Sequence, residues 1–160
     1  MTASKAATAL NKHLPASRAL PLDILLQVNT SGEASKSGLA PLADDADADT
    51  TATASTDLAK LALHVLRDCP RLRLLGLMTI GSLEASLADS DGNRDFETLV
   101  RTRDALHQVL RAEAADFTSW GRDGKLLLSM GMSSDFAPAI QAGSDIVRVG
   151  TSIFGSRLRT

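Results

Sequence analysis

The chain has little of what disulfide-stabilised, zinc-binding and membrane-spanning proteins need. Its single cysteine, Cys69, has no partner for an internal disulfide, and no cysteine and histidine cluster shows metal-ligand spacing. No apolar run is long enough to cross a bilayer, and residues 1–14 contain no signal-peptide core. The sequence therefore predicts a cytoplasmic protein without structural zinc. Because residues 1–14 also contain no acidic residue, a mitochondrial transit peptide is the minor alternative to a solvated helix there.

A strong charge of either sign is also absent. The formal net charge is −2 and the isoelectric point is about 5.9, so no basic field surrounds the chain. Hydrophobic residues make up 44% of the sequence and charged residues 22%, which is typical of a soluble globular protein rather than a disordered or fibrous one. The sequence therefore predicts a folded domain with no nucleic-acid partner and no membrane partner.

Short apolar runs alternate with longer amphipathic segments, the pattern of βα units in a parallel sheet. We expect strands over 23–28, 72–79, 126–130 and 146–149. We expect helices over 56–68 with Thr56 as N-cap, over 95–112, and from a cap at Ser133 or Ser134 to near Gly143. Four βα units are half of an eight-stranded barrel, so the predicted fold is α/β, a partial TIM (β/α)8 barrel occupying residues 1–160.

Residues 43–55 interrupt this pattern with alanine, aspartate, threonine and serine only. Such a segment cannot bury enough apolar surface to offset the entropy of ordering it. The sequence therefore predicts a disordered surface insertion over 43–55.

The segments that follow the predicted strands are rich in glycine, serine and threonine, and in parallel α/β folds ligands bind at these strand ends. Ser133 is expected where a strand passes into a helix N-terminus, and Gly150 and Thr151 follow the last strand. Backbone N–H groups and hydroxyls in this arrangement favour a phosphate. The structural alternatives are an N-cap role for Ser133 and a simple turn at Gly150 and Thr151.

Arg148 is the charged residue of an otherwise apolar strand, and a buried guanidinium needs a partner. One interpretation is a structural ion pair at the end of the sheet. The other is a contact with the ring nitrogen or an anionic group of a ligand. The sequence pattern leaves both open.

Four segments, LLQVNTSGEASKSGL, GLMTIGS, LSMGMSSDF and GSDIVRVGTSIFGSR, resemble in order the motifs of the YggS/PROSC family of pyridoxal 5'-phosphate (PLP) homeostasis proteins. The resemblance covers most of the chain from Asp23 to Arg157 and implies a barrel like the N-terminal domain of alanine racemase. By this resemblance, Ser133, Gly150 and Thr151 hold the PLP phosphate and Arg148 faces the pyridine nitrogen. An arginine there disfavours protonation of the ring and weakens PLP as an electron sink.

The family's first strand, which carries its Schiff-base lysine, has no counterpart in this sequence, so a C-terminal portion of the barrel is expected. Lys36 follows the first predicted strand, but the resemblance gives it no Schiff-base role. An incomplete barrel is expected to leave open strand edges near Asp23 and Ile146, which favour self-association.

The resemblance implies a PLP-binding protein of intracellular PLP (vitamin B6) homeostasis without established catalytic turnover, not an enzyme, with no catalytic or metal-binding residue. Its implied partners are PLP and PLP-dependent apoenzymes, and a monomer is expected when the barrel is complete. Two alternatives stay open: a truncated product without independent function, and a fragment of an alanine racemase-like PLP enzyme. The second needs a base from another domain, for which the nine residues after Thr151 leave no room.

Overall fold

A twisted parallel sheet organises the chain. The computed structural model describes residues 1–42, 53–81, 93–113 and 120–155. Within these residues the sheet has four strands, β1 (Leu22–Val28), β2 (Leu72–Thr79), β3 (Leu127–Met132) and β4 (Ile146–Arg148), in the order β1-β2-β3-β4. All neighbouring strands are parallel and alternate with helices, so the predicted α/β class is confirmed.

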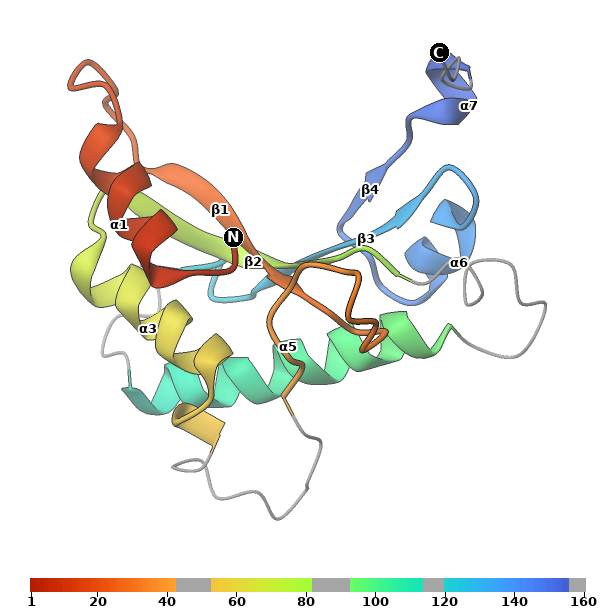
Figure 1. Cartoon of the computed structure of the whole chain (residues 1–160), viewed down its shortest axis with the longest axis horizontal. Coiled ribbons are helices and arrows are strands. Elements are labelled where there is room, and N and C mark those ends of the chain that lie inside the picture. Colours follow the sequence, from red (N-terminus) through yellow and green to blue (C-terminus); the bar gives the residue numbers. More distant parts are fainter. Residues whose placement is uncertain (43–52, 82–92, 114–119, 156–160) are drawn as a thin grey trace.

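The helices cover one face of this sheet and both of its ends. They are α1 (Ser4–His13), α3 (Asp57–Asp68), α5 (Arg94–Glu113), α6 (Phe136–Gln141) and α7 (Thr151–Phe154). Figure 1 shows α3 and α5 beneath the sheet, with α1 rising at one end and α7 at the other. None of the described helices is long and apolar enough to cross a membrane. Because all four strands are parallel, their C-terminal ends lie at one edge of the sheet, and the predicted binding segments lie at this edge.

The hydrophobic periodicity of the sequence explains which face is covered. Alternate residues of β1, namely Ile24, Leu26 and Val28, are buried, as expected for a strand packed on helices on one side. They pack with Leu58 of α3 and Leu106 of α5 in one hydrophobic core. Each such side chain stabilises the fold by about 1.5–3 kcal/mol.

The two predicted helix caps have different outcomes. Thr56 caps α3 as expected, because its hydroxyl accepts a hydrogen bond from the backbone N–H of Ala59 at 3.3 Å. The cap predicted at Ser133 or Ser134 is wrong, since α6 begins after Asp135. Asp135 instead accepts a hydrogen bond from the backbone N–H of Met132 at 2.6 Å, which closes the turn between β3 and α6. Ser133 is thereby left outside the helix.

The predicted insertion over 43–55 is described only at its end. Residues 43–52 lie outside the described residues. Among the described residues of the segment, Thr53 and Ala54 are helical and Ser55 lies in a turn before α3. In this turn the carbonyl of Thr53 accepts hydrogen bonds from the backbone and the hydroxyl of Thr56, and Ala54 packs against the core. The apolar contact of Ala54 offsets part of the entropy of ordering this end of the segment.

The open edge expected at β1 is partly covered. The amino group of Met1 donates to the carbonyl of Leu25 at 2.9 Å, and the backbone N–H of Gln27 donates to the carbonyl of Met1 at 3.0 Å. Further along, Leu39 donates to Gln27 at 2.9 Å and accepts from Asn29 at 2.8 Å. Met1 and Leu39 thus occupy the outer edge of β1 in the way that a parallel neighbour would. The prediction of two open strand edges was wrong for the C-terminal half of β1. There, segments distant in sequence supply the backbone hydrogen-bond partners.

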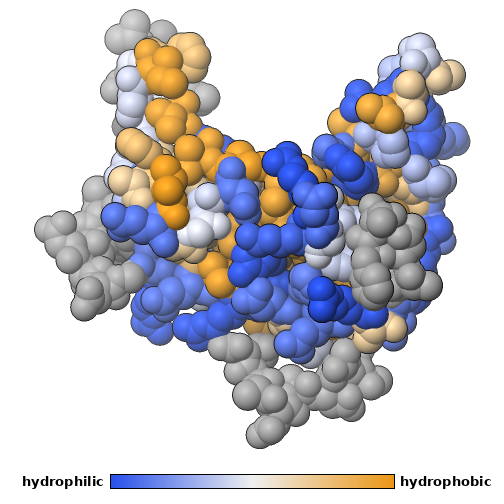
Figure 2. All heavy atoms as spheres, turned by 180° about the vertical axis from the view of Figure 1, so that it is seen from behind, coloured by the Kyte–Doolittle hydropathy of each residue, from blue (hydrophilic) through white to orange (hydrophobic). Residues whose placement is uncertain are grey.

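The opposite end of the sheet carries exposed apolar side chains. On α7, Ile153 is 67% exposed and Phe154 is 85% exposed, and Ile140 of α6 is 55% exposed. Figure 2 shows hydrophobic residues along the arm formed by β4 and α7. Any self-association of the chain is therefore expected to use the β4 side rather than the β1 side.

Candidate functional site

Ser133 and the segment after β4 meet at the C-terminal edge of the sheet. The hydroxyl oxygen of Ser133 accepts hydrogen bonds from the backbone N–H of Gly150 at 3.0 Å and of Ser152 at 3.3 Å. Thr151 lies between these two residues and is the exposed first residue of α7. The structure therefore brings together three of the four residues predicted from the sequence. It also adds the backbone of Ser152, which the sequence analysis did not single out.

The geometry of this turn suits an anion. Two backbone N–H groups, at the start of a short helix, point at one oxygen atom, which here belongs to Ser133. Backbone N–H groups arranged in this way bind phosphate oxygens in many proteins. Each backbone N–H carries one hydrogen, so a phosphate oxygen would use these donors in place of the Ser133 oxygen. The sequence left a phosphate site and a simple turn open at Gly150 and Thr151, and the phosphate site stays a prediction.

Arg148 is held by oxygen atoms of β3, the strand next to its own, and of β2, the strand beyond. Its Nη1 donates to the carbonyl of Ser129 at 3.0 Å and to the hydroxyl of Ser129 at 2.8 Å, and its Nη2 donates to the carbonyl of Thr79 at 2.7 Å. Burial lowers the pKa of the guanidinium, and the nearby carboxylate of Asp135 raises it. The arginine stays charged at neutral pH, since guanidinium groups do not deprotonate in proteins.

This arrangement departs from the first interpretation, a structural ion pair, while the second, a contact with a ligand, stays a prediction. No ion pair of Arg148 occurs among the described residues, and its hydrogen-bond partners there are neutral oxygens. Three of its five N–H donors are directed at the protein, and within the described part of the chain the other two remain for a ligand. Half-buried Arg148 is therefore a fixed cation beside the Ser133 turn rather than half of a structural ion pair.

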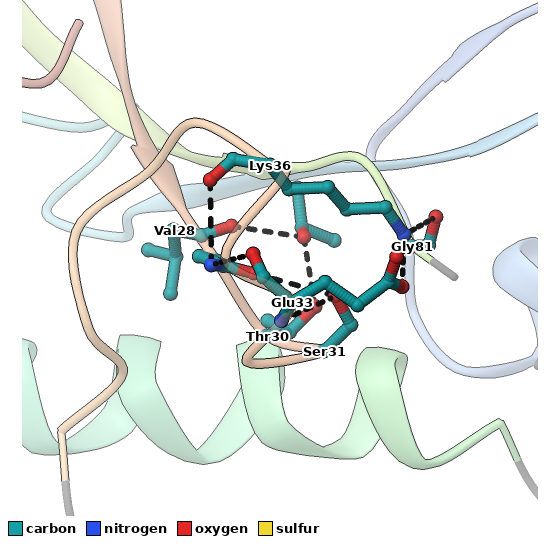
Figure 3. A network of polar contacts seen from close by, with 8 residues as sticks. Val28, Thr30, Ser31, Glu33, Lys36 and Gly81 are labelled. Atoms are coloured by element: carbon teal, nitrogen blue, oxygen red, sulfur yellow. Dashed lines mark hydrogen bonds and ion pairs between the residues drawn. The ribbon is translucent and has the colours of Figure 1, made fainter.

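The loop after β1 completes the edge on its other side (Figure 3). The hydroxyl of Thr79 donates to the carbonyl of Val28 at 3.0 Å and lies 2.8 Å from the hydroxyl of Thr30. Since the carbonyl of Thr79 also accepts from Arg148, this residue links the loop to β4 through hydrogen bonds. The linked residues span all four strands of the sheet.

Lys36 is tied into the same loop. Its Nζ donates to Oε1 of Glu33 at 2.6 Å and to the carbonyl of Gly81 at 2.9 Å (Figure 3). The hydrogen bond from Lys36 lowers the pKa of Glu33, so the carboxylate is ionised at neutral pH. Lys36 thus fastens the loop after β1 to the end of β2. This engaged geometry suits a structural contact better than a nucleophilic amine.

Comparison with curated proteins shows clear relatives. No protein-family model matches the chain. The pyridoxal phosphate homeostasis protein of Schizosaccharomyces pombe is 44% identical over 138 residues, which cover 86% of this chain and 46% of that protein. The protein of the same name from Vibrio alginolyticus is 39% identical over 155 residues, covering 96% of this chain and 53% of that protein. The chain spans about half the length of the curated relatives it matches.

Solved structures agree with this relationship. A protein of unknown function from Bifidobacterium adolescentis superposes with a TM-score of 0.63 at 31% identity, covering 96% of this chain and 51% of the other. PipY of Synechococcus elongatus, solved without PLP, has a TM-score of 0.58 at 20% identity and covers 97% and 59%. PipY solved with PLP bound has a TM-score of 0.50 at 21% identity, covering 97% and 68%. At these identities PipY shows likeness of fold. By sequence and by fold, the chain is a relative of the pyridoxal phosphate homeostasis proteins and corresponds to a C-terminal portion of about half their length.

Proposed function

We propose that the chain binds PLP at the C-terminal edge of its sheet. The observation that carries this proposal is the convergence of the Gly150 and Ser152 N–H groups on one oxygen, beside the fixed cation Arg148. A phosphate needs N–H donors, and a pyridine ring needs a partner for its nitrogen. The names of the relatives and the PLP bound to PipY support the choice of PLP among phosphorylated ligands.

Each residue has one task in this proposal. Ser133, Gly150 and Thr151 hold the phosphate, with the backbone of Ser152 as an additional donor. Arg148 donates a hydrogen bond to the pyridine nitrogen, and its positive charge disfavours protonation of the ring. Bound PLP supplies an aldehyde and an electron-withdrawing ring, and an unprotonated ring withdraws electrons less strongly. This electrostatic setting favours storage of the cofactor over its use in catalysis.

The proposed role is PLP homeostasis in the cytosol, in which the protein buffers PLP or delivers it to apoenzymes. The curated relatives carry that name, and the chain covers about half of their length. The proposal relies on non-covalent contacts to the phosphate and to the ring nitrogen, and it assigns no Schiff-base role to Lys36.

The phosphate contacts are tested by Ser133→Ala and Thr151→Val. Each substitution is expected to weaken PLP binding by about 0.5–3 kcal/mol, because it removes a hydroxyl from a charged phosphate. Equilibrium dialysis of the chain against PLP measures the change. Ser134→Ala is the matched control, since Ser134 is an exposed neighbouring serine and is expected to leave the affinity unchanged. Unchanged affinity in both variants would reduce Ser133 and Thr151 to turn residues.

A further inference from the structure

Arg148 contacts β3, the strand paired with its own, and also β2, one strand further across the sheet. In the β3–β4 register Arg148 lies opposite Met132, whereas Ser129 lies opposite Ile146. The guanidinium nevertheless contacts Ser129 and also Thr79, the last residue of β2. The arginine side chain therefore runs back along β3 and ends where β2 and β3 lie side by side.

The partners of the guanidinium are almost completely buried. Ser129 is 2% exposed and Thr79 is 1% exposed, so neither changes its position freely. Two of the three acceptors are backbone carbonyls, fixed by the sheet itself. The third acceptor is the hydroxyl of Ser129, 2.8 Å from Nη1. This hydroxyl is the side-chain acceptor among the three.

We propose that Ser129 is a positioning residue that sets the orientation of Arg148 toward the ring nitrogen of PLP; this inference rests on the proposed function. Nη1 is occupied on both of its hydrogens by Ser129, and Nη2 is occupied on one by Thr79. These contacts fix the plane of the guanidinium. The donors that remain are on Nε and Nη2.

The neutrality of the acceptors is part of this role. A carboxylate in the place of the Ser129 hydroxyl would neutralise the guanidinium and would reduce its effect on the ring nitrogen. A hydroxyl and two carbonyls orient the cation without cancelling its charge. Ser129 thus preserves the electrostatic property on which the proposed storage role depends.

The test compares Ser129→Ala with Ser144→Ala in this chain. Ser144 is a matched control because its hydroxyl joins β3 to β4, donating to the carbonyl of Met130 at 2.8 Å, with no contact to Arg148 among the described residues. In the ligand-free chain, NMR measures how fast the guanidinium protons of Arg148 exchange with water. Ser129→Ala is expected to accelerate this exchange about fivefold or more, and Ser144→Ala to leave it unchanged.

Two ligands then separate orientation from general binding. The first is PLP, and the second is its carbocyclic analogue, in which CH replaces the ring nitrogen. Ser129→Ala is expected to weaken PLP binding about tenfold and to leave binding of the analogue within about twofold. Equal losses for both ligands, or no loss for PLP, would overturn the positioning role while PLP binding stands.

Failure of the proposed function has a different signature. An unaltered chain that binds neither PLP nor inorganic phosphate would overturn the proposed function, and with it the role of Ser129 toward the ring. The exchange measurement still decides in that case whether Ser129 orients Arg148. Unchanged guanidinium exchange in Ser129→Ala would overturn the orientation itself.

Discussion

Replacing Arg148 by methionine is expected to weaken PLP binding by about 1.5–3 kcal/mol, the range for a hydrogen bond to a charged group. The same change removes the donors from the carbonyls of Thr79 and Ser129, both buried, so the free energy of unfolding should fall by about 1–3 kcal/mol. Equilibrium dialysis and thermal unfolding measure the two effects separately.

Two further variants separate the effect of the charge from that of the guanidinium shape and control for the loss of an arginine. Arg148→Lys keeps the positive charge but not the planar fork, so we expect it to recover part of the stability and little of the PLP affinity. Arg122→Met removes an exposed arginine and is the control, expected to change neither quantity. PLP affinity that is equal in Arg148→Met and in the unaltered chain would show that the guanidinium does not contact the ligand.

The second large effect is expected at Gly76, in the middle of the sheet. Gly76 lies opposite Leu127 in the β2–β3 register, next to an irregularity in the β1–β2 pairing. A Cβ atom at Gly76 would lie 1.9 Å from the carbonyl oxygen of Leu127 and 2.6 Å from its nitrogen. Both strands are central to the core, so neither backbone can move away cheaply. Gly76→Ala is therefore expected to destabilise the chain by at least about 3 kcal/mol.

Circular dichroism during heating measures this loss as a lower melting temperature or as the absence of a cooperative transition. The control is Gly150→Ala, where an added Cβ meets no atom within 4 Å and the backbone angle φ is −120°. We expect that control to change the free energy of unfolding by less than about 0.5 kcal/mol. A stable, cooperative Gly76→Ala variant would contradict the close approach of β2 and β3.

Local sequence patterns predicted the sheet and its helices well where one physical signal dominated. The apolar run over Leu72–Thr79 gives β2 with the expected bounds, and the apolar period after Thr56 gives α3 with the expected cap. Both features depend on residues that are neighbours in the chain. The gathering of Ser133, Gly150 and Thr151 was also predictable, because parallel strands end at one edge of a sheet.

Contacts between distant segments could not be predicted in this way. Neither Ser129 nor Thr79 stood out in the sequence as a partner of Arg148, since the match depends on how far the arginine side chain reaches across β3. Covering of the β1 edge by Met1 and Leu39 likewise depends on a register that no local pattern encodes. The cap of α6 was misplaced because Ser133, Ser134 and Asp135 all favour an N-cap, and the fold uses Ser133 elsewhere.

The location of the PLP site is tested most directly by NMR of the isotope-labelled chain during titration with PLP. The account predicts that the amide signals of Gly150 and Ser152 and the side-chain signal of Arg148 shift together as PLP is added. Inorganic phosphate should shift the two amides but not Arg148. If PLP leaves all three signals in place, or shifts only residues remote from the C-terminal edge of the sheet, the proposed site is contradicted.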